Sequence, residues 1–136
     1  MSHTELTEAE SVMVSHARVA RLATADPDGM PHVVPVCPVL DGDHVLIASD
    51  ESAKLRNLRA DPRVALVVDD YLEDWDALRR VLVRGTATVI QDGPAWVRGR
   101  ELLYEKFPQY EPQAPIVAGR TVMVRIAVEQ VSSEGV

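Results

Sequence analysis

Apolar residues alternate with polar ones, or run together, in several short stretches of the chain. The clearest case is 81–90, where Val81, Val83 and Val89 fall on one face of an extended backbone. Residues branched at Cβ are frequent in these stretches and favour the extended conformation. We therefore predict six strands, over residues 18–24, 32–40, 44–49, 63–69, 81–90 and 121–131.

Three further stretches carry apolar residues at the spacing of a helical face. Thr7 and Glu10 have the spacing of a capping box, in which each side chain accepts a bond from the other residue's backbone N–H. Leu55 and Leu58 are three residues apart, and Asp61-Pro62 ends that run because proline cannot continue a helix. We predict short helices over 7–16, 52–60 and 94–106, a loop or single helical turn over 71–79, and a loop over 108–119.

Turn sequences connect the first predicted strands into hairpins. Asp26-Pro27-Asp28-Gly29 and Asp41-Gly42-Asp43 both end a strand with residues that favour tight turns. The stretch 32–40 contains Pro35 and Pro38, which donate no ladder hydrogen bonds, so this strand is irregular or lies at an edge. The predicted fold is mainly β (α+β): a six-stranded, largely antiparallel sheet closed or nearly closed into a split barrel, with short flanking helices.

The composition is that of one globular domain covering residues 1–136. The net charge of -7 makes nucleic acid an unexpected partner. No apolar run reaches the about 18 residues of a membrane span, and the acidic N-terminal segment is unlike a signal peptide. Cys37 is the only cysteine, so no internal disulfide forms, and the four histidines share no ligand spacing with it. We expect a cytoplasmic protein with no metal site and no membrane contact.

The junction between the third predicted strand and the second predicted helix carries the candidate chemistry. Ser49, Asp50 and Ser52 are placed to accept bonds from free N–H groups at the start of the helix, and Lys54 follows in its first turn. Free N–H groups, hydroxyls and an ammonium together suit a phosphate. The alternative is an ordinary capped helix with a solvated face, and the carboxylates of Asp50 and Glu51 would repel a phosphate.

Three short motifs follow one another along the chain. They are Leu22-Ala23-Thr24 with Asp28-Gly29 and Pro31, Lys54 with Arg56-Asn57-Leu58 and Asp61-Pro62-Arg63, and Gly85 with Ala87. In this order and spacing the chain resembles, over about residues 10–131, the pyridoxamine 5'-phosphate oxidase-like split β-barrel family. It looks most like the small actinobacterial members thought to use the deazaflavin coenzyme F420.

The resemblance implies a homodimer that holds a redox cofactor in a groove between its subunits. It places the cofactor phosphate near Ser49, Lys54 and Arg56, the ring against 34–37, and a residue matching Trp75 on the partner subunit's side. Many relatives carry arginine where this chain has Ser52, which is a departure from the pattern. The residues expected to bind the cofactor are Ser49, Lys54, Arg56, Asn57, Pro35, Val36, Cys37 and Trp75.

The helical residues of this set also have purely structural explanations. The structural explanation of Lys54 is a helix lysine whose charge is solvated. The structural explanation of Asn57 is a side chain that hydrogen-bonds a nearby turn. The structural explanation of Arg56 is a surface ion pair with Asp50 or Glu51, which would contribute only about 0–1 kcal/mol to stability.

The remaining residues leave alternatives open as well. Cys37 is explained as a small buried hydrophobe, since no basic partner that would activate it is apparent. Trp75 covers a ring or an interface, or plugs one end of the barrel. No Ser-His-Asp, Cys-His or paired-carboxylate arrangement stands out, so the catalytic residues are unknown.

We therefore expect an F420-dependent oxidoreductase that transfers a hydride between its cofactor and a small unsaturated substrate, with the cofactor supplying the reactive group. One alternative is an FMN-dependent reductase or oxidase of the same fold, and another is a binding protein that holds a cofactor and catalyses nothing. The substrate is not identified. An acidic coenzyme tail would favour basic groups along the groove, for which the candidates are Arg18, Arg21, Arg59 and Arg79.

Overall fold

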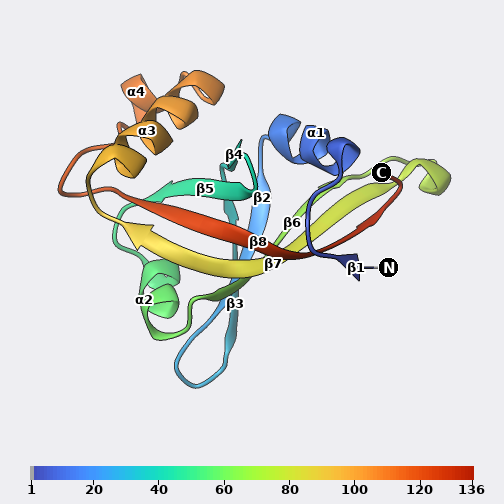
Figure 1. Cartoon of the computed structure of the whole chain (residues 1–136), viewed down its shortest axis with the longest axis horizontal. Coiled ribbons are helices and arrows are strands. Elements are labelled where there is room, and N and C mark those ends of the chain that lie inside the picture. The colour runs from blue at the N-terminus through green and yellow to red at the C-terminus, as the bar shows by residue number, and fades with distance from the viewer. Residues whose placement is uncertain (1) are drawn as a thin grey trace.

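The computed structural model describes residues 2–136, and an antiparallel sheet of eight strands runs through its centre (Figure 1). The predicted antiparallel pairing is confirmed, because every strand pair in the described chain is antiparallel. The strands are β1 (Ser2–His3), β2 (Ala20–Ala25), β3 (Pro31–Val36), β4 (Val39–Asp41), β5 (His44–Ser49), β6 (Arg63–Asp70), β7 (Arg79–Ile90) and β8 (Val122–Glu134).

The predicted count of six strands is wrong for two local reasons. The two-residue strand β1, which pairs with the end of β8, is too short to show any periodicity. The predicted strand 32–40 is two strands, because its pairing partner changes. Up to Val36 it pairs with β2, and from Val39 onward it pairs with β5. Cys37 and Pro38 make the passage, and proline's missing N–H suits a residue that pairs with neither neighbour.

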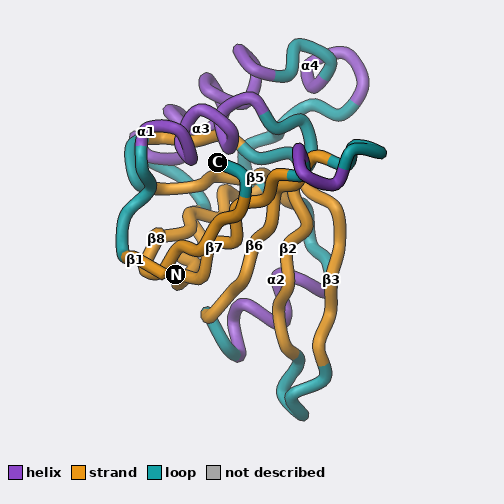
Figure 2. The backbone as a smooth tube through the Cα atoms, turned by 90° about the vertical axis from the view of Figure 1, so that its right-hand side faces the viewer, coloured by secondary structure: helices purple, strands orange, loops and turns teal. Residues whose placement is uncertain are grey.

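This passage shows that the sheet is curled. The strand order is β3-β2-β6-β7-β8-β5-β4, so β3 and β4 stand at its two ends. Only Cys37 and Pro38 separate them, and three Cα–Cα steps span at most about 11 Å. The two ends of the sheet are therefore drawn together, as the split-barrel prediction requires. Figure 2 shows β3, β2, β6 and β7 as one continuous wall.

Four α-helices and one 3₁₀ turn flank the sheet in the described chain. They are α1 (Glu8–His16), α2 (Ala53–Ala60), η1 (Trp75–Ala77), α3 (Pro94–Lys106) and α4 (Tyr110–Gln113). The predicted capping box is confirmed, since Glu10 N donates to Thr7 Oγ1 over 3.2 Å and Thr7 N donates to Glu10 Oε1 over 2.8 Å. Helix α4 was missed in the predicted loop 108–119, because a single turn containing a proline carries no helical period.

The core has two parts. The larger lies between the sheet and helices α1 and α2, and includes Leu22, Leu55 and Ile126. The smaller lies under α3, where Trp96 and Met123 are buried. This second cluster fixes α3 and α4 beside β5, and so places them next to the junction between β5 and α2 (Figure 1).

The glycine of the third motif has a structural role. The pairing of β7 with β8 shifts register between Arg84 and Gly85. At this bulge the strands approach so closely that a Cβ on Gly85 would overlap the carbonyl oxygen of Ala127. Only glycine fits there without a shift of the backbone.

No helix within residues 2–136 has the length and apolar character needed to cross a membrane.

Candidate functional site

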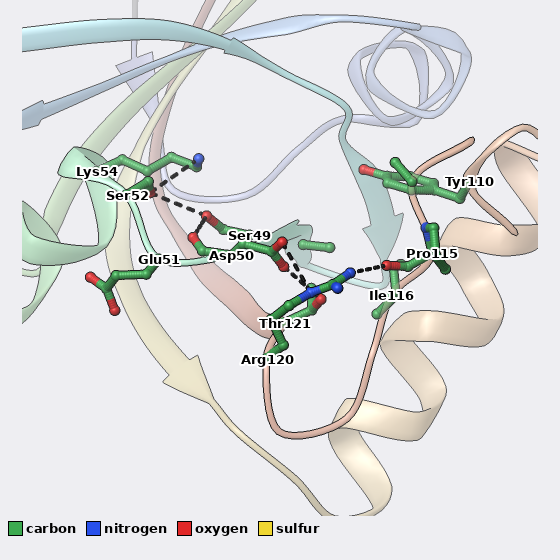
Figure 3. Close-up of a pocket in the computed structure, with 12 residues that line it drawn as sticks. Ser49, Asp50, Glu51, Ser52, Lys54, Tyr110, Pro115, Ile116, Arg120 and Thr121 are labelled. Atoms are coloured by element: carbon green, nitrogen blue, oxygen red, sulfur yellow. Dashed lines mark hydrogen bonds and ion pairs between the residues drawn. The ribbon is translucent and has the colours of Figure 1, made fainter. Parts of the chain in front are cut away.

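A cavity of about 340 Å³ opens beside the junction of β5 and α2 (Figure 3). This size is at the lower end of the about 300–1,000 Å³ typical of ligand sites. One wall comes from the end of β5 and the start of α2, and the opposite wall from α4 and the loop that leads to β8. The lining residues include Ser49, Asp50, Ser52, Lys54, Tyr110, Ile116, Arg120 and Thr121.

Helix α2 begins without a side-chain cap. Ser52 occupies the N-cap position in an extended conformation, but its side chain makes no capping bond. The first backbone bond of the helix runs from Arg56 N to Ser52 O over 3.2 Å, so the N–H groups before it have no partner in the helix. These N–H groups carry the positive end of the helix dipole.

The predicted caps are wrong. Ser49 Oγ donates to the carbonyl oxygen of Asp50 over 2.7 Å, and it lies 3.3 Å from Ser52 Oγ. The Asp50 carboxylate accepts instead from Thr121 Oγ1 over 2.7 Å, a residue of the loop before β8. Sequence proximity suggested local capping, but a partner 71 residues away takes the carboxylate.

Lys54 is partly buried and carries an uncompensated charge. None of the ion pairs among residues 2–136 includes it, and its Nζ makes only a long contact of 3.4 Å to Ser52 Oγ. Burial lowers the pKa of Lys54, and the nearby Asp50 charge opposes that shift in part. An anion bound beside Nζ would relieve this cost.

The carboxylates expected to repel a phosphate are both neutralised. Arg120 Nε lies 3.3 Å from Asp50 Oδ2, and Arg59 Nη1 lies 3.0 Å from both carboxylate oxygens of Glu51. The suggestion that Arg56 pairs with either carboxylate is wrong. Arg120 reaches the junction only through the tertiary fold, and Arg59 lies one turn further along α2 than Arg56. The corner is thus open rather than closed by its own acidic groups.

Two residues of the matched helix motif lie outside the cavity. Arg56 is exposed and takes part in no side-chain hydrogen bond or ion pair within residues 2–136. Asn57 is buried, and its Nδ2 donates to Thr24 Oγ1 of β2 over 3.0 Å. Asn57 is therefore a structural bond-maker, although its partner is a strand residue rather than a turn. Of the predicted cofactor-binding residues, the cavity brings together Ser49 and Lys54.

The predicted ring-facing residues follow one another at the end of β3. Pro35 is exposed, Val36 is buried in the larger core, and Cys37 is partly buried against the smaller one. The expectation that Cys37 lacks a basic neighbour is wrong, because Lys106 of α3 lies beside it and donates to Pro38 O over 2.7 Å. Burial and the charge of Arg18 lower the pKa of Lys106 to about 8, against the opposing influence of Cys37.

Trp75 lies away from the cavity. Its side chain is 72% exposed, and its Nε1 donates to Tyr71 Oη over 3.3 Å. The connection between β6 and β7 that carries it lies at the opposite end of the molecule from α2 (Figure 1). The suggestion that Trp75 plugs the barrel is wrong, and within one chain it does not join Lys54.

Sequence reasoning missed the far wall of the cavity. Tyr110, Ile116, Arg120 and Thr121 all lie in or beside the predicted loop 108–119, where no periodicity or motif marked them. The only available signal was the basic-polar pair Arg120-Thr121 directly before the last strand.

Chemically, the arrangement suits an organic anion. Lys54 and the start of α2 provide positive groups on one wall, the hydroxyl of Tyr110 stands on the opposite wall, and Pro115 and Ile116 add apolar surface beside Tyr110 (Figure 3). Within residues 2–136, no three His, Cys, Asp or Glu side chains come together as metal ligands.

A curled antiparallel sheet with a cleft at a strand–helix junction is the arrangement of the split-barrel class. The chain belongs to the pyridoxamine 5'-phosphate oxidase family, whose model matches residues 6–134.

Two curated relatives show the range of the family. The chain is 38% identical over 79 residues to a 5a,11a-dehydrotetracycline/5a,11a-dehydrooxytetracycline reductase of Streptomyces rimosus, covering 54% of this chain and 56% of that protein. It is 38% identical over 93 residues to a pyridoxine/pyridoxamine 5'-phosphate oxidase of Azorhizobium caulinodans, covering 66% of this chain and 42% of that protein. The chain thus aligns with about half the length of these relatives.

Solved structures share the whole fold. A conserved hypothetical protein of Mycobacterium tuberculosis superposes with a TM-score of 0.81 at 28% identity. The superposition covers 96% of this chain and 85% of the mycobacterial chain. An FAD-binding protein of Mesorhizobium loti gives 0.77 at 28% identity, with coverage of 98% and 96%. A structure named F420 reductase gives 0.75 at 23% identity, with coverage of 93% and 98%, which speaks for the fold alone.

Proposed function

We propose that this chain is an F420-dependent oxidoreductase that transfers a hydride between the deazaflavin and a small unsaturated substrate. The observation that carries the proposal is the uncompensated ammonium of Lys54 at the uncapped start of α2, beside an open cavity. Both features suit a phosphate, which each candidate coenzyme contains. The coenzyme, when bound, supplies the hydride chemistry.

The residues of this chain would bind and orient the coenzyme. Lys54 Nζ, the hydroxyls of Ser49 and Ser52, and the free N–H groups of α2 hold the phosphate. The pairing of Asp50 with Arg120 and Thr121 keeps its carboxylate from competing with that phosphate.

The rest of the coenzyme site belongs to the same proposal. The end of β3, from Pro35 through Val36 to Cys37, provides a wall for the ring. The resemblance assigns Trp75 to the coenzyme site. Because Trp75 is exposed at the far end of the molecule from Lys54, it would reach a coenzyme held there only from a second subunit, and we propose a homodimer on that ground.

A second candidate keeps the site and uses FMN as a reductase or an oxidase. The resemblance to a pyridoxine/pyridoxamine 5'-phosphate oxidase supports it. The resemblance to a reductase of Streptomyces rimosus supports a reductase, and the fold shared with a structure named F420 reductase is compatible with the deazaflavin. Tight binding of either coenzyme without turnover of quinone or enone acceptors would instead favour a non-catalytic binding protein.

The test is equilibrium binding of F420 and of FMN, followed by the fluorescence of each coenzyme, to the parent and to Lys54→Met. Methionine keeps the length of the side chain and removes its charge. Losing one charge-assisted contact of about 1.5–3 kcal/mol should weaken binding by roughly 10-fold to 150-fold. Arg84→Met, which removes an exposed charge on β7, is the matched control and should change binding less than twofold.

Two results would count against the proposal. If neither coenzyme binds to the parent at tens of micromolar, the oxidoreductase assignment fails. If Lys54→Met binds as tightly as the parent, Lys54 does not hold the phosphate. Arg56→Met separates the resemblance from the geometry, because the exposed position of Arg56 predicts little loss.

A further inference from the structure

Tyr110, the first residue of α4, stands on the wall of the cavity that faces Lys54. Figure 3 shows its phenolic oxygen directed into the cavity, toward the side where Ser52 and Lys54 lie. No sequence motif includes Tyr110, so its placement is decided by the fold.

The ring of Tyr110 is held by its neighbours. It packs edge-on against Phe107 with ring centroids 6.0 Å apart, and against Tyr104 at 6.4 Å. Its backbone is fixed as well, since Tyr110 N donates to Phe107 O over 3.0 Å and Ala114 N donates to Tyr110 O over 2.8 Å. The hydroxyl is therefore presented at a defined point of the cavity.

Within residues 2–136, the hydroxyl of Tyr110 makes no hydrogen bond to an oxygen or nitrogen atom. Its polar neighbour is the Cys37 thiol, a weak hydrogen-bonding partner that a better acceptor would replace. The hydroxyl of Tyr104 differs, because it accepts a hydrogen bond from Ile116 N over 3.0 Å and so has a structural role. Burial, with a contribution from Cys37, raises the pKa of Tyr110 to about 12. The phenol thus keeps its proton at neutral pH and acts as a donor.

We infer that Tyr110 is a ligand-positioning residue whose hydroxyl donates to a carbonyl oxygen of an organic anion, while the anionic group lies at Lys54. A simple inorganic anion fills only one end of this cavity, whereas a ligand with a phosphate and a carbonyl engages both ends. The inference rests on the proposed function, since F420 and FMN both join a phosphate to a ring that carries carbonyl groups.

The test compares the parent with Tyr110→Phe, which keeps the ring and removes the hydroxyl. Binding of F420 and FMN is followed by fluorescence, and inorganic phosphate is used as a competitor. Coenzyme binding should weaken by about fivefold to tenfold, as expected for one neutral hydrogen bond, while the competition constant of phosphate stays unchanged. Ser15→Ala, which removes an exposed hydroxyl on α1, is the control and should leave both unchanged.

The outcomes separate the two proposals. If the coenzyme binds equally to the parent and to Tyr110→Phe, the role of Tyr110 fails and the proposed function stands. If the variant loses phosphate and coenzyme alike, the cavity has collapsed and the hydroxyl has no specific role. If neither coenzyme binds to the parent, both proposals fail together.

Discussion

Glu10 offers the sharpest test of how this fold is held together. Its side chain is only 2% exposed, and its carboxylate joins three elements. His3 Nε2 of β1 lies 2.7 Å from Oε1, Thr7 N at the start of α1 donates to the same oxygen over 2.8 Å, and Ser133 Oγ of β8 donates to Oε2 over 2.5 Å. Replacing Glu10 with glutamine removes the charge on which these contacts depend.

The magnitude follows from the pKa of Glu10. Burial alone would raise it, but the hydrogen bonds from His3, Ser133 and Thr7 outweigh burial and lower the pKa from 4.5 to about 2. The difference is about 2.5 units, and at about 1.4 kcal/mol per unit it corresponds to about 3 kcal/mol of folding free energy. Because the folded pKa is the lower one, this stabilisation is complete above pH 4.5 and is lost as the pH falls toward 2.

The assay is urea unfolding of the parent and Glu10→Gln at neutral pH and again near the acid end of that window. The parent should be more stable by about 2–3 kcal/mol at neutral pH, and the difference should shrink as Glu10 becomes protonated. Glu8→Gln, which changes an exposed residue of the same helix, controls for net charge. A difference that stays constant with pH would refute the reasoning, because the loss would then come from packing and not from the ionised carboxylate.

Two further predictions concern close packing and a buried amine. Gly85→Ala should lower the free energy of unfolding by more than about 2 kcal/mol, because its Cβ meets backbone, whereas Gly99→Ala should cost less, because its Cβ meets the flexible Met123 side chain. Equal losses in thermal unfolding would show that the bulge tolerates a side chain. The pKa of Lys106, lowered from 10.5 to about 8, means that the unfolded chain binds more protons between those values, so stability should rise with pH there. Lys106→Met should reduce that rise, to which Lys54 also contributes, and a slope unchanged in the variant would assign it to another group.

Local chemistry was sufficient to predict several elements. The capping box of Thr7 and Glu10, the turn at Gly29 and the junction from β5 into α2 all depend on residues close together in the chain. The antiparallel hairpins follow from the same short-range turn preferences. The resemblance in motifs added the family, which the match over residues 6–134 shows.

The composition of the candidate site was only half accessible in this way. Ser49 and Lys54 were found because they stand beside a predicted helix start, where anion binding has a local cause. Tyr110 was missed because it lies in a single helical turn that has no periodic signal. Arg56 was chosen from a motif, but its side chain points to solvent while Arg120, 70 residues from Asp50, pairs with that carboxylate.

By itself, then, the sequence determined the alternation of strands, the helix boundaries to within about a residue at α1 and α2, and the presence of a basic, hydroxyl-bearing helix start. Only the tertiary structure decided that 32–40 divides between the two ends of the sheet, that remote residues neutralise Asp50 and leave Lys54 unpaired, and that Tyr110 faces it. The reason is physical: backbone preferences act over a few residues, whereas charge pairing and cavity walls depend on which distant segments the packed core brings together.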